Sequence, residues 1–114
     1  MSEKSLRYND GKLKFALIPA EMLEELAKIF TKGAFKYDDN NWMRSINSGL
    51  PSEEFRTGCM NSMLRHINAY RKGELHDPEP VDGCDIQTSH MGHAAWNCLV
   101  LFYYDAMEGS SSGS

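Results

Sequence analysis

The chain has 114 residues, with 12 basic and 16 acidic side chains and a formal net charge of −4 at pH 7. This length suits one domain with a single modest core, and the acidic balance argues against a non-specific nucleic-acid binder, which needs a basic face. The longest apolar run, residues 98–104, is too short to cross a membrane. There is no signal-peptide pattern, and the three cysteines have no CxxC spacing, so we expect a cytoplasmic protein without disulfides.

The N-terminal part is predicted to be an extended arm followed by a helix. An Asn-Asp-Gly turn at residues 9–11 allows the arm, residues 5–17, to pair as a short hairpin. Pro19 favours the start of a helix, because its fixed φ and missing N–H do no harm there. Apolar residues then recur at three- and four-residue spacing, and Gly33 predicts the end of the helix. Residues 34–50 show no sustained period and are predicted to be a loop.

A second helix is predicted over residues 51–72, and the charge distribution changes where it ends. Residues 1–72 hold all 12 basic side chains, whereas residues 73–114 hold none and carry 7 acidic ones. Five of these acids crowd into residues 74–85, within a segment, 74–88, whose two prolines and glycine predict a loop. Carboxylates without local counter-ions repel one another, and hard divalent cations are bound well by clustered carboxylate oxygens.

The last predicted helix runs from about Ser89, a candidate N-cap, to Met107. Between positions 94 and 104 it is apolar nearly all round, and a helix with no polar face is buried on several sides. Three helices of one small domain cannot cover it, so we expect a homo-oligomer, either a dimer or a tetramer. The domain is predicted to span residues 1–108, followed by a disordered Gly/Ser tail at 109–114.

The histidines of the two later helices suggest a metal site next to the acidic loop. His90, His93 and Asn97 share one face of the last helix, and His66 approaches them if the two helices are antiparallel. Carboxylates with imidazoles fit Mg²⁺, Mn²⁺ or Co²⁺ better than a thiol-preferring ion. The predicted metal ligands are His66, Glu74, Asp77, Glu79, His90 and His93. The alternative is that the histidines are packing residues and the acidic loop is only solvated.

A second group of residues suggests a nucleotide site. Lysines suit phosphate as point charges, while Tyr37 or Trp42 could stack on a base and Asn41 could read its edge. The predicted nucleotide-binding residues are Lys12, Lys14, Lys36, Tyr37, Asn41, Trp42, Arg65 and Asn97. The alternative is a set of surface lysines with a tryptophan that caps the core. There is no P-loop or other Gly-rich phosphate motif.

Five short blocks occur in a fixed order between residues 6 and 105. They are 7–12 (RYNDGK), 31–37 (TKGAFKY) with Asn41 and Trp42, Arg65-His66, Gly73-Glu74 with Asp77 and Glu79, and 90–93 (HMGH) with Trp96 and Asn97. In this order they resemble the phage dATP/dGTP diphosphohydrolases, relatives of the MazG-type nucleoside-triphosphate pyrophosphatases. One departure concerns the metal ligands, because His90 and His93 stand where the wider MazG pattern has an ExxD pair on its last helix.

The resemblance implies an all-α, MazG-like helical bundle with an extended N-terminal arm, assembled as an oligomer. It implies an enzyme that uses Mn²⁺, Mg²⁺ or Co²⁺ to cleave dGTP or dATP to the monophosphate and pyrophosphate. In some phages this reaction supplies dGMP for 2-aminoadenine DNA and removes dATP. Asp77 and Glu79 would be catalytic, holding or deprotonating the attacking water. Lys12, Lys36 and Arg65 would stabilise charge on the leaving group.

Two alternatives of other classes remain open from the sequence. A non-catalytic oligomeric module could bind nucleotides or metals through the same face. A metallophosphatase of HD type would need an adjacent His-Asp pair on a helix, whereas His76-Asp77 lies in a loop flanked by proline.

Overall fold

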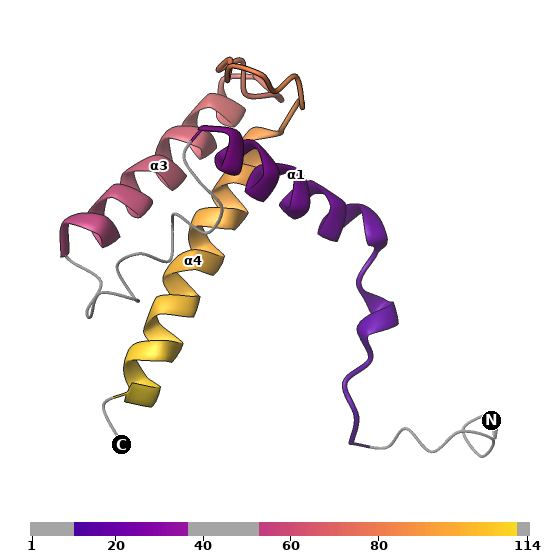
Figure 1. Ribbon diagram of the computed structural model, residues 1–114, viewed down its shortest axis with the longest axis vertical. Coiled ribbons are helices and arrows are strands. Elements are labelled where there is room, and N and C mark those ends of the chain that lie inside the picture. Colours follow the sequence, from indigo (N-terminus) through magenta and orange to yellow (C-terminus); the bar gives the residue numbers. More distant parts are fainter. Residues whose placement is uncertain (1–10, 37–52, 112–114) are drawn as a thin grey trace.

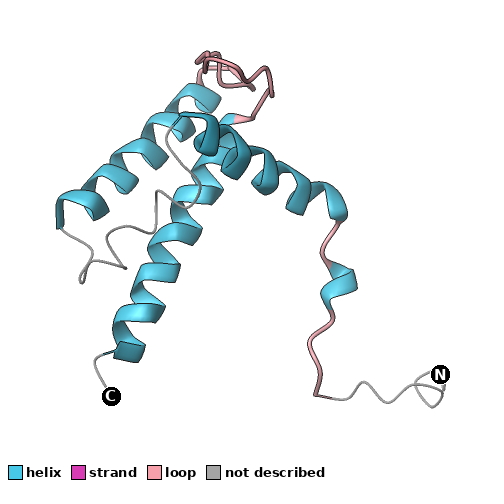
Figure 2. Cartoon of the chain, in the orientation of Figure 1, coloured by secondary structure: helices cyan, strands magenta, loops and turns pink. Residues whose placement is uncertain are grey.

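The computed structural model describes residues 11–36 and 53–111, and it consists of helices and loops (Figure 1). The helices are α1 (Ala20–Lys36), α3 (Glu53–Arg71) and α4 (His90–Ser111), and a short 3-10 turn, η2 (Phe15–Leu17), precedes α1. The described residues contain no strand (Figure 2), so the predicted all-α class is confirmed for this part of the chain. None of the described helices is both long and apolar enough to pass through a lipid bilayer.

Helices α3 and α4 form an antiparallel pair that the acidic loop joins at one end (Figure 1). Their shared core is built on the buried side chains of Cys59, Val100 and Tyr104. The Tyr104 ring lies 4.8 Å from the Phe55 ring, centroid to centroid, and Trp96 and Leu101 pack around them. Burial of these large side chains is the main force that holds the pair together.

Two local motifs fix the ends of the acidic loop. At the end of α3, the N–H of Gly73 bonds to Tyr70 O and the N–H of Glu74 bonds to Ala69 O, which is a Schellman motif. Gly73 has a φ of 101°, a left-handed conformation that favours glycine. At the start of α4, Ser89 Oγ accepts the N–H of Gly92 at 2.9 Å, so the predicted N-cap is confirmed.

Helix α1 crosses α4 close to this N-cap. Glu25 Oε2 accepts the N–H of Ser89 at 2.8 Å, and Phe30 packs edge-on against Trp96 with ring centroids 5.8 Å apart. Gly92 makes the approach possible, because a Cβ there would lie 2.8 Å from Glu25 Cγ and 2.9 Å from Ile29 Cδ1.

We therefore expect Gly92→Ala to destabilise the protein by about 1–3 kcal/mol, because the added methyl group pushes α1 away from α4. The matched control is Gly58→Ala in α3, where a Cβ would meet nothing within 4 Å. That variant should be more stable by about 0.5–1 kcal/mol, through the better helix propensity of alanine. Urea unfolding of both variants measures the difference. Equal stability of the two would contradict the close contact.

Three predicted boundaries differ from the structure. Helix α1 continues past Gly33 to Lys36, because Gly33 does not adopt the left-handed conformation that ends a helix. The predicted loop therefore begins too early, at 34. Helix α4 continues beyond Met107 to Ser111, so the boundary set at 109 falls inside the helix. In the arm, residues 15–17 form a 3-10 turn and residues 11–14 form no strand, so this part is not half of a hairpin. The other half, and most of the predicted 34–50 loop, lie outside the described residues.

Candidate metal centre

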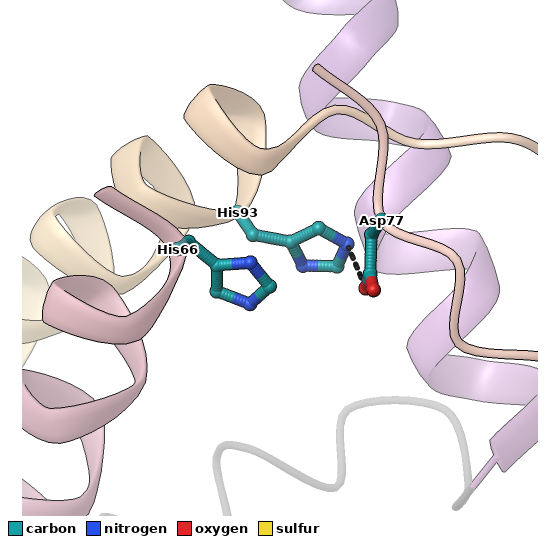
Figure 3. Close-up of side chains that lie close together, drawn as sticks. All are labelled: His66, Asp77 and His93. Carbon is teal, nitrogen blue, oxygen red and sulfur yellow. Dashed lines mark ion pairs between the residues drawn. The ribbon is translucent and has the colours of Figure 1, made fainter. Parts of the chain in front are cut away.

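Three side chains from different parts of the chain meet where α3 and α4 lead into the acidic loop (Figure 3). His66 comes from the last turns of α3, Asp77 from the loop and His93 from the first turn of α4. One potential ligand atom of each lies within 4.8 Å of the other two. The rings of His66 and His93 are stacked, with centroids 4.6 Å apart. The antiparallel pairing of the helices is what brings these residues together.

Backbone pairing between the two ends of the loop positions Asp77. The N–H of Asp77 donates to Thr88 O at 2.9 Å, and the N–H of His90 donates to Leu75 O at 3.0 Å. The carboxylate is held in turn by its own loop, since its Oδ1 accepts the N–H of Glu79 at 3.1 Å. The second oxygen, Oδ2, lies 3.4 Å from His93 Nε2. Asp77 therefore presents one oxygen to the histidines while the other is fixed by the backbone.

Both histidines of the cluster are neutral at pH 7. Burial lowers the pKa of His93 to about 4, and the neighbouring His66 adds to the effect. Burial also lowers the pKa of His66, although the Asp77 charge opposes this. Neutral imidazoles offer lone pairs, as metal binding requires. The contact between Asp77 and His93 is consequently one between a carboxylate and a neutral imidazole, and not between opposite charges.

One pair of atoms in the cluster has the spacing of two ligands of a divalent transition-metal ion. Two ligand atoms that each lie about 2.1 Å from a tetrahedrally bound ion are about 3.4 Å apart, which matches the separation of Asp77 Oδ2 and His93 Nε2, 3.4 Å. Two imidazoles with one carboxylate suit Mn²⁺ or Co²⁺, whereas Mg²⁺ prefers oxygen ligands alone.

His90 and Glu74 form a chain of hydrogen bonds that leads away from the cluster. His66 Nδ1 lies 2.8 Å from His90 Nδ1, and His90 Nε2 lies 2.8 Å from Glu74 Oε1. A carboxylate only accepts, so His90 Nε2 donates to Glu74, and in the neutral ring the Nδ1 of His90 then accepts from the Nδ1–H of His66. The lone pair of His66 is then on Nε2, away from His90. Buried His90 and half-exposed Glu74 thus set the tautomer of His66, as outer partners of metal-bound histidines do.

The chain matches the family described as "dATP/dGTP diphosphohydrolase, N-terminal" over residues 2–111. The chain belongs to this family. A protein named dATP/dGTP diphosphohydrolase, from Salmonella phage PMBT28, is 26% identical over 98 residues. The match covers 86% of this chain and 29% of the phage protein, so the chain spans less than a third of that relative's length. No solved structure matches the present chain.

Three more of the predicted site residues lie on the acidic loop and on the two paired helices. Glu79 is exposed beside Asp77, and Arg65 is exposed next to His66. Asn97 is buried within the helix pair, where its Nδ2 donates to His93 O at 2.9 Å and to Ser62 Oγ at 3.4 Å.

Among the predicted nucleotide-binding residues of the N-terminal half, the structure describes the side chains of Lys12 and Lys14. Lys12 and Lys14 are exposed on the arm, which leads away from α3 and α4 (Figure 1). Lys36 is the last residue of α1, and its side chain lies outside the described part of the structure. Tyr37, Asn41 and Trp42 also lie outside the described residues.

Three polar residues near the cluster were missed in the sequence. Glu25 contacts the start of α4, while Lys32 and Thr88 are buried beside His93. The sequence does hold a signal for the first two, because Glu25 and Lys32 lie on the same face of α1 as buried Ile29, at i, i+4 and i+7. Charged residues on the buried face of a helix usually have a partner there.

The lowered pKa of His93 predicts how stability depends on pH in the metal-free protein. The folded-state pKa, about 4, lies below the unfolded value of 6.5, so between these values the unfolded chain binds a proton that the folded chain does not. Stability should therefore be complete above pH 6.5 and fall as the pH drops towards 4, by about 1.4 kcal/mol for each unit of difference between the two pKa values. Urea unfolding in EDTA at several pH values measures this, and His93→Gln should show a shallower slope. An equal slope in the variant would contradict the prediction.

Proposed function

We propose that this chain hydrolyses purine deoxynucleoside triphosphates, dGTP and dATP, to the monophosphate and pyrophosphate with a bound divalent ion. The observation that carries the proposal is the meeting of His66, Asp77 and His93 within 4.8 Å, in a member of the dATP/dGTP diphosphohydrolase family. The relative's name supports the choice of substrates. In a phage, the reaction would supply dGMP for 2-aminoadenine DNA and remove dATP.

The cluster residues would hold Mn²⁺ or Co²⁺, with His66, Asp77 and His93 as ligands and with His90 and Glu74 orienting His66. When bound, such an ion polarises phosphoryl oxygens and lowers the pKa of a water molecule. Asp77 has a side chain that is only 10% exposed and faces His93, which suits a ligand. Glu79 is exposed in the same loop, and its charge acts on His66. We assign Glu79 as the group that accepts the proton of the attacking water.

The reaction needs a water oxygen to bond to the α-phosphorus while the bond to the β-phosphate oxygen breaks and pyrophosphate leaves. The exposed guanidinium of Arg65, next to His66, would stabilise the charge that develops on the leaving group. Lys12, Lys14 and Lys36 would join it when substrate is bound. Tyr37, Asn41 and Trp42 are proposed to contact the base.

Product analysis tests the proposal. The purified chain is incubated with dGTP and Mn²⁺ or Co²⁺, and the products are separated by ion-exchange chromatography, with an EDTA-treated sample as the control. We expect dGMP and pyrophosphate in equal amounts and no turnover in EDTA. Orthophosphate or tripolyphosphate would indicate a different enzyme, such as an HD-type phosphohydrolase. Tight binding without turnover would indicate a non-catalytic module and overturn the proposal.

We also propose that the chain assembles as a MazG-like homo-oligomer, a dimer or a tetramer. In the single chain, Leu99 and Phe102 on α4 are 48% and 65% exposed, and Met22 and Leu23 on α1 are also exposed. Large apolar side chains gathered on a surface usually mark an interface.

Light scattering at micromolar concentration should therefore give at least twice the monomer mass of 12.9 kDa. Phe102→Glu should reduce the mass to that of a monomer, because a charge would be buried in the interface. The control Thr57→Glu adds the same charge at an exposed polar position on α3 and should leave the mass unchanged. A monomer mass for the unmutated chain would contradict the prediction.

A further inference from the structure

Lys32 is a buried cation without a counter-ion among the described residues. Its side chain on α1 is only 7% exposed, and its one polar contact within residues 11–36 and 53–111 is a 3.5 Å hydrogen bond from Nζ to Thr88 Oγ1. An ammonium group has three hydrogens to donate. Burying it with a single long hydrogen bond costs several kcal/mol unless an anion joins it.

The position of Thr88 connects this ammonium to the metal ligands. Thr88 is fully buried, and its Oγ1 lies 2.8 Å from His93 Nε2 as well as 3.5 Å from Lys32 Nζ. His93 Nε2 in turn lies 3.4 Å from Asp77 Oδ2. The lysine therefore points at the same place as the ligand set, with one hydroxyl group between them.

The Lys32 ammonium and a divalent ion held by His66, Asp77 and His93 would repel each other unless an anion lay between them. The Asp77 carboxylate faces His93, and no described carboxylate contacts Lys32. A ligand that carries more than one negative charge and several acceptor oxygens would supply this charge. A phosphate group has this chemistry, and lysine binds phosphate as a point charge.

We propose that Lys32 and Thr88 form a phosphate-binding subsite beside the metal ligands, which takes the leaving pyrophosphate portion of the nucleotide. This inference rests on the proposed function for the identity of the anion. Lys32 would donate to the terminal phosphate oxygens and neutralise part of the charge that builds up on pyrophosphate as it leaves. The subsite would also bind inorganic pyrophosphate alone.

Binding of inorganic pyrophosphate tests the subsite without turnover. Isothermal titration in the presence of Mn²⁺ compares the unmutated protein with Lys32→Met, which keeps the length of the side chain and removes its charge. We expect the affinity for pyrophosphate to fall about ten- to a hundredfold, the value of one charge-assisted hydrogen bond. Lys28→Met is the matched control, since Lys28 lies one turn away on α1, is 46% exposed and pairs with Glu25. Its affinity should be unchanged.

Thermal unfolding without any anion separates this role from a structural one. Replacing a buried, poorly paired ammonium by an apolar side chain should leave the melting temperature of Lys32→Met equal or higher. A clear fall in that temperature, or unchanged pyrophosphate affinity, would overturn the proposal. If Lys32→Met does not fold, the unmutated protein is labelled with ¹³C-lysine and studied by NMR. The signal of Lys32 is the one that is absent from the spectrum of Lys32→Arg. The Cε resonance of Lys32 should shift when pyrophosphate is added and that of Lys28 should not, and an unmoved Lys32 signal overturns the subsite.

These measurements also distinguish failure of the subsite from failure of the proposed function. A chain that hydrolyses dGTP but binds pyrophosphate equally well with Lys32→Met refutes the subsite alone. A chain that loses pyrophosphate binding in Lys32→Met but never cleaves dGTP supports the subsite and refutes the proposed enzyme activity.

Discussion

Asp77→Asn should abolish turnover and weaken divalent-ion binding by at least about a hundredfold, because the amide keeps the shape of the carboxylate but not its charge. Ligand carboxylates contribute more than the outer partners of a metal site, whose loss costs about ten- to a hundredfold. The fold should persist, since the backbone bonds of the loop, from Asp77 N–H to Thr88 O and from His90 N–H to Leu75 O, do not involve the side chain. Titration with Mn²⁺ and the dGTP assay measure the two effects.

Glu79→Gln is the matched control, because the two acids lie in the same loop and Asp77 is the one that belongs to the cluster with His66 and His93. It should bind Mn²⁺ as well as the unmutated protein and lose about a hundred- to ten-thousandfold in rate, as expected for a lost general base. Near-full activity of both variants with a saturating ion would show that the acidic loop is only a solvated connection between the helices.

The second large effect concerns His66 and its supporting chain. His66→Ala removes a proposed ligand and should lower Mn²⁺ affinity at least as much as Asp77→Asn. Glu74→Gln removes only the charge at the far end of the chain, 2.8 Å from His90 Nε2, and should cost no more than about tenfold in affinity. Isothermal titration with Mn²⁺ gives both values under the same conditions.

Equal losses in these two variants would show that Glu74 is itself a ligand, as the sequence predicted. The structure instead places Glu74 and His90 one step away from the cluster, through the 2.8 Å contact between His66 Nδ1 and His90 Nδ1. In a site that holds a second ion, Glu74 and His90 would be its ligands. The same titration tests this, because it gives the number of ions bound per chain.

The helices and the approach of His66 to His93 could be predicted from the sequence because both follow from short-range rules. Helical periodicity puts His90 and His93 on one face. The long loop between the two helices permits an antiparallel pairing, which the sequence left as a condition and the structure shows. The N-cap at Ser89 follows from its hydroxyl group, and the helix end at Gly73 follows from the missing Cβ of glycine.

The features that the sequence did not reveal depend on contacts between distant segments. Gly33 has the residue type of a helix end, but the helix continues to Lys36. Lys32 looks like any surface lysine until α1 is placed across the start of α4, where it is buried beside Thr88. Gly92 likewise gives no sign in the sequence that α1 must approach there, because its role depends on Glu25 and Ile29.

Titration of the metal-free chain with Co²⁺, followed by visible absorption, tests most directly whether His66, Asp77 and His93 form a metal centre. Imidazole and carboxylate ligands change the absorption of Co²⁺ from that of the hydrated ion. We expect a saturable spectrum in the unmutated chain, which is lost in His66→Ala, His93→Ala and Asp77→Asn and kept in Lys28→Met. A spectrum that equals that of free Co²⁺, or one that all four variants retain, would contradict the metal centre described here.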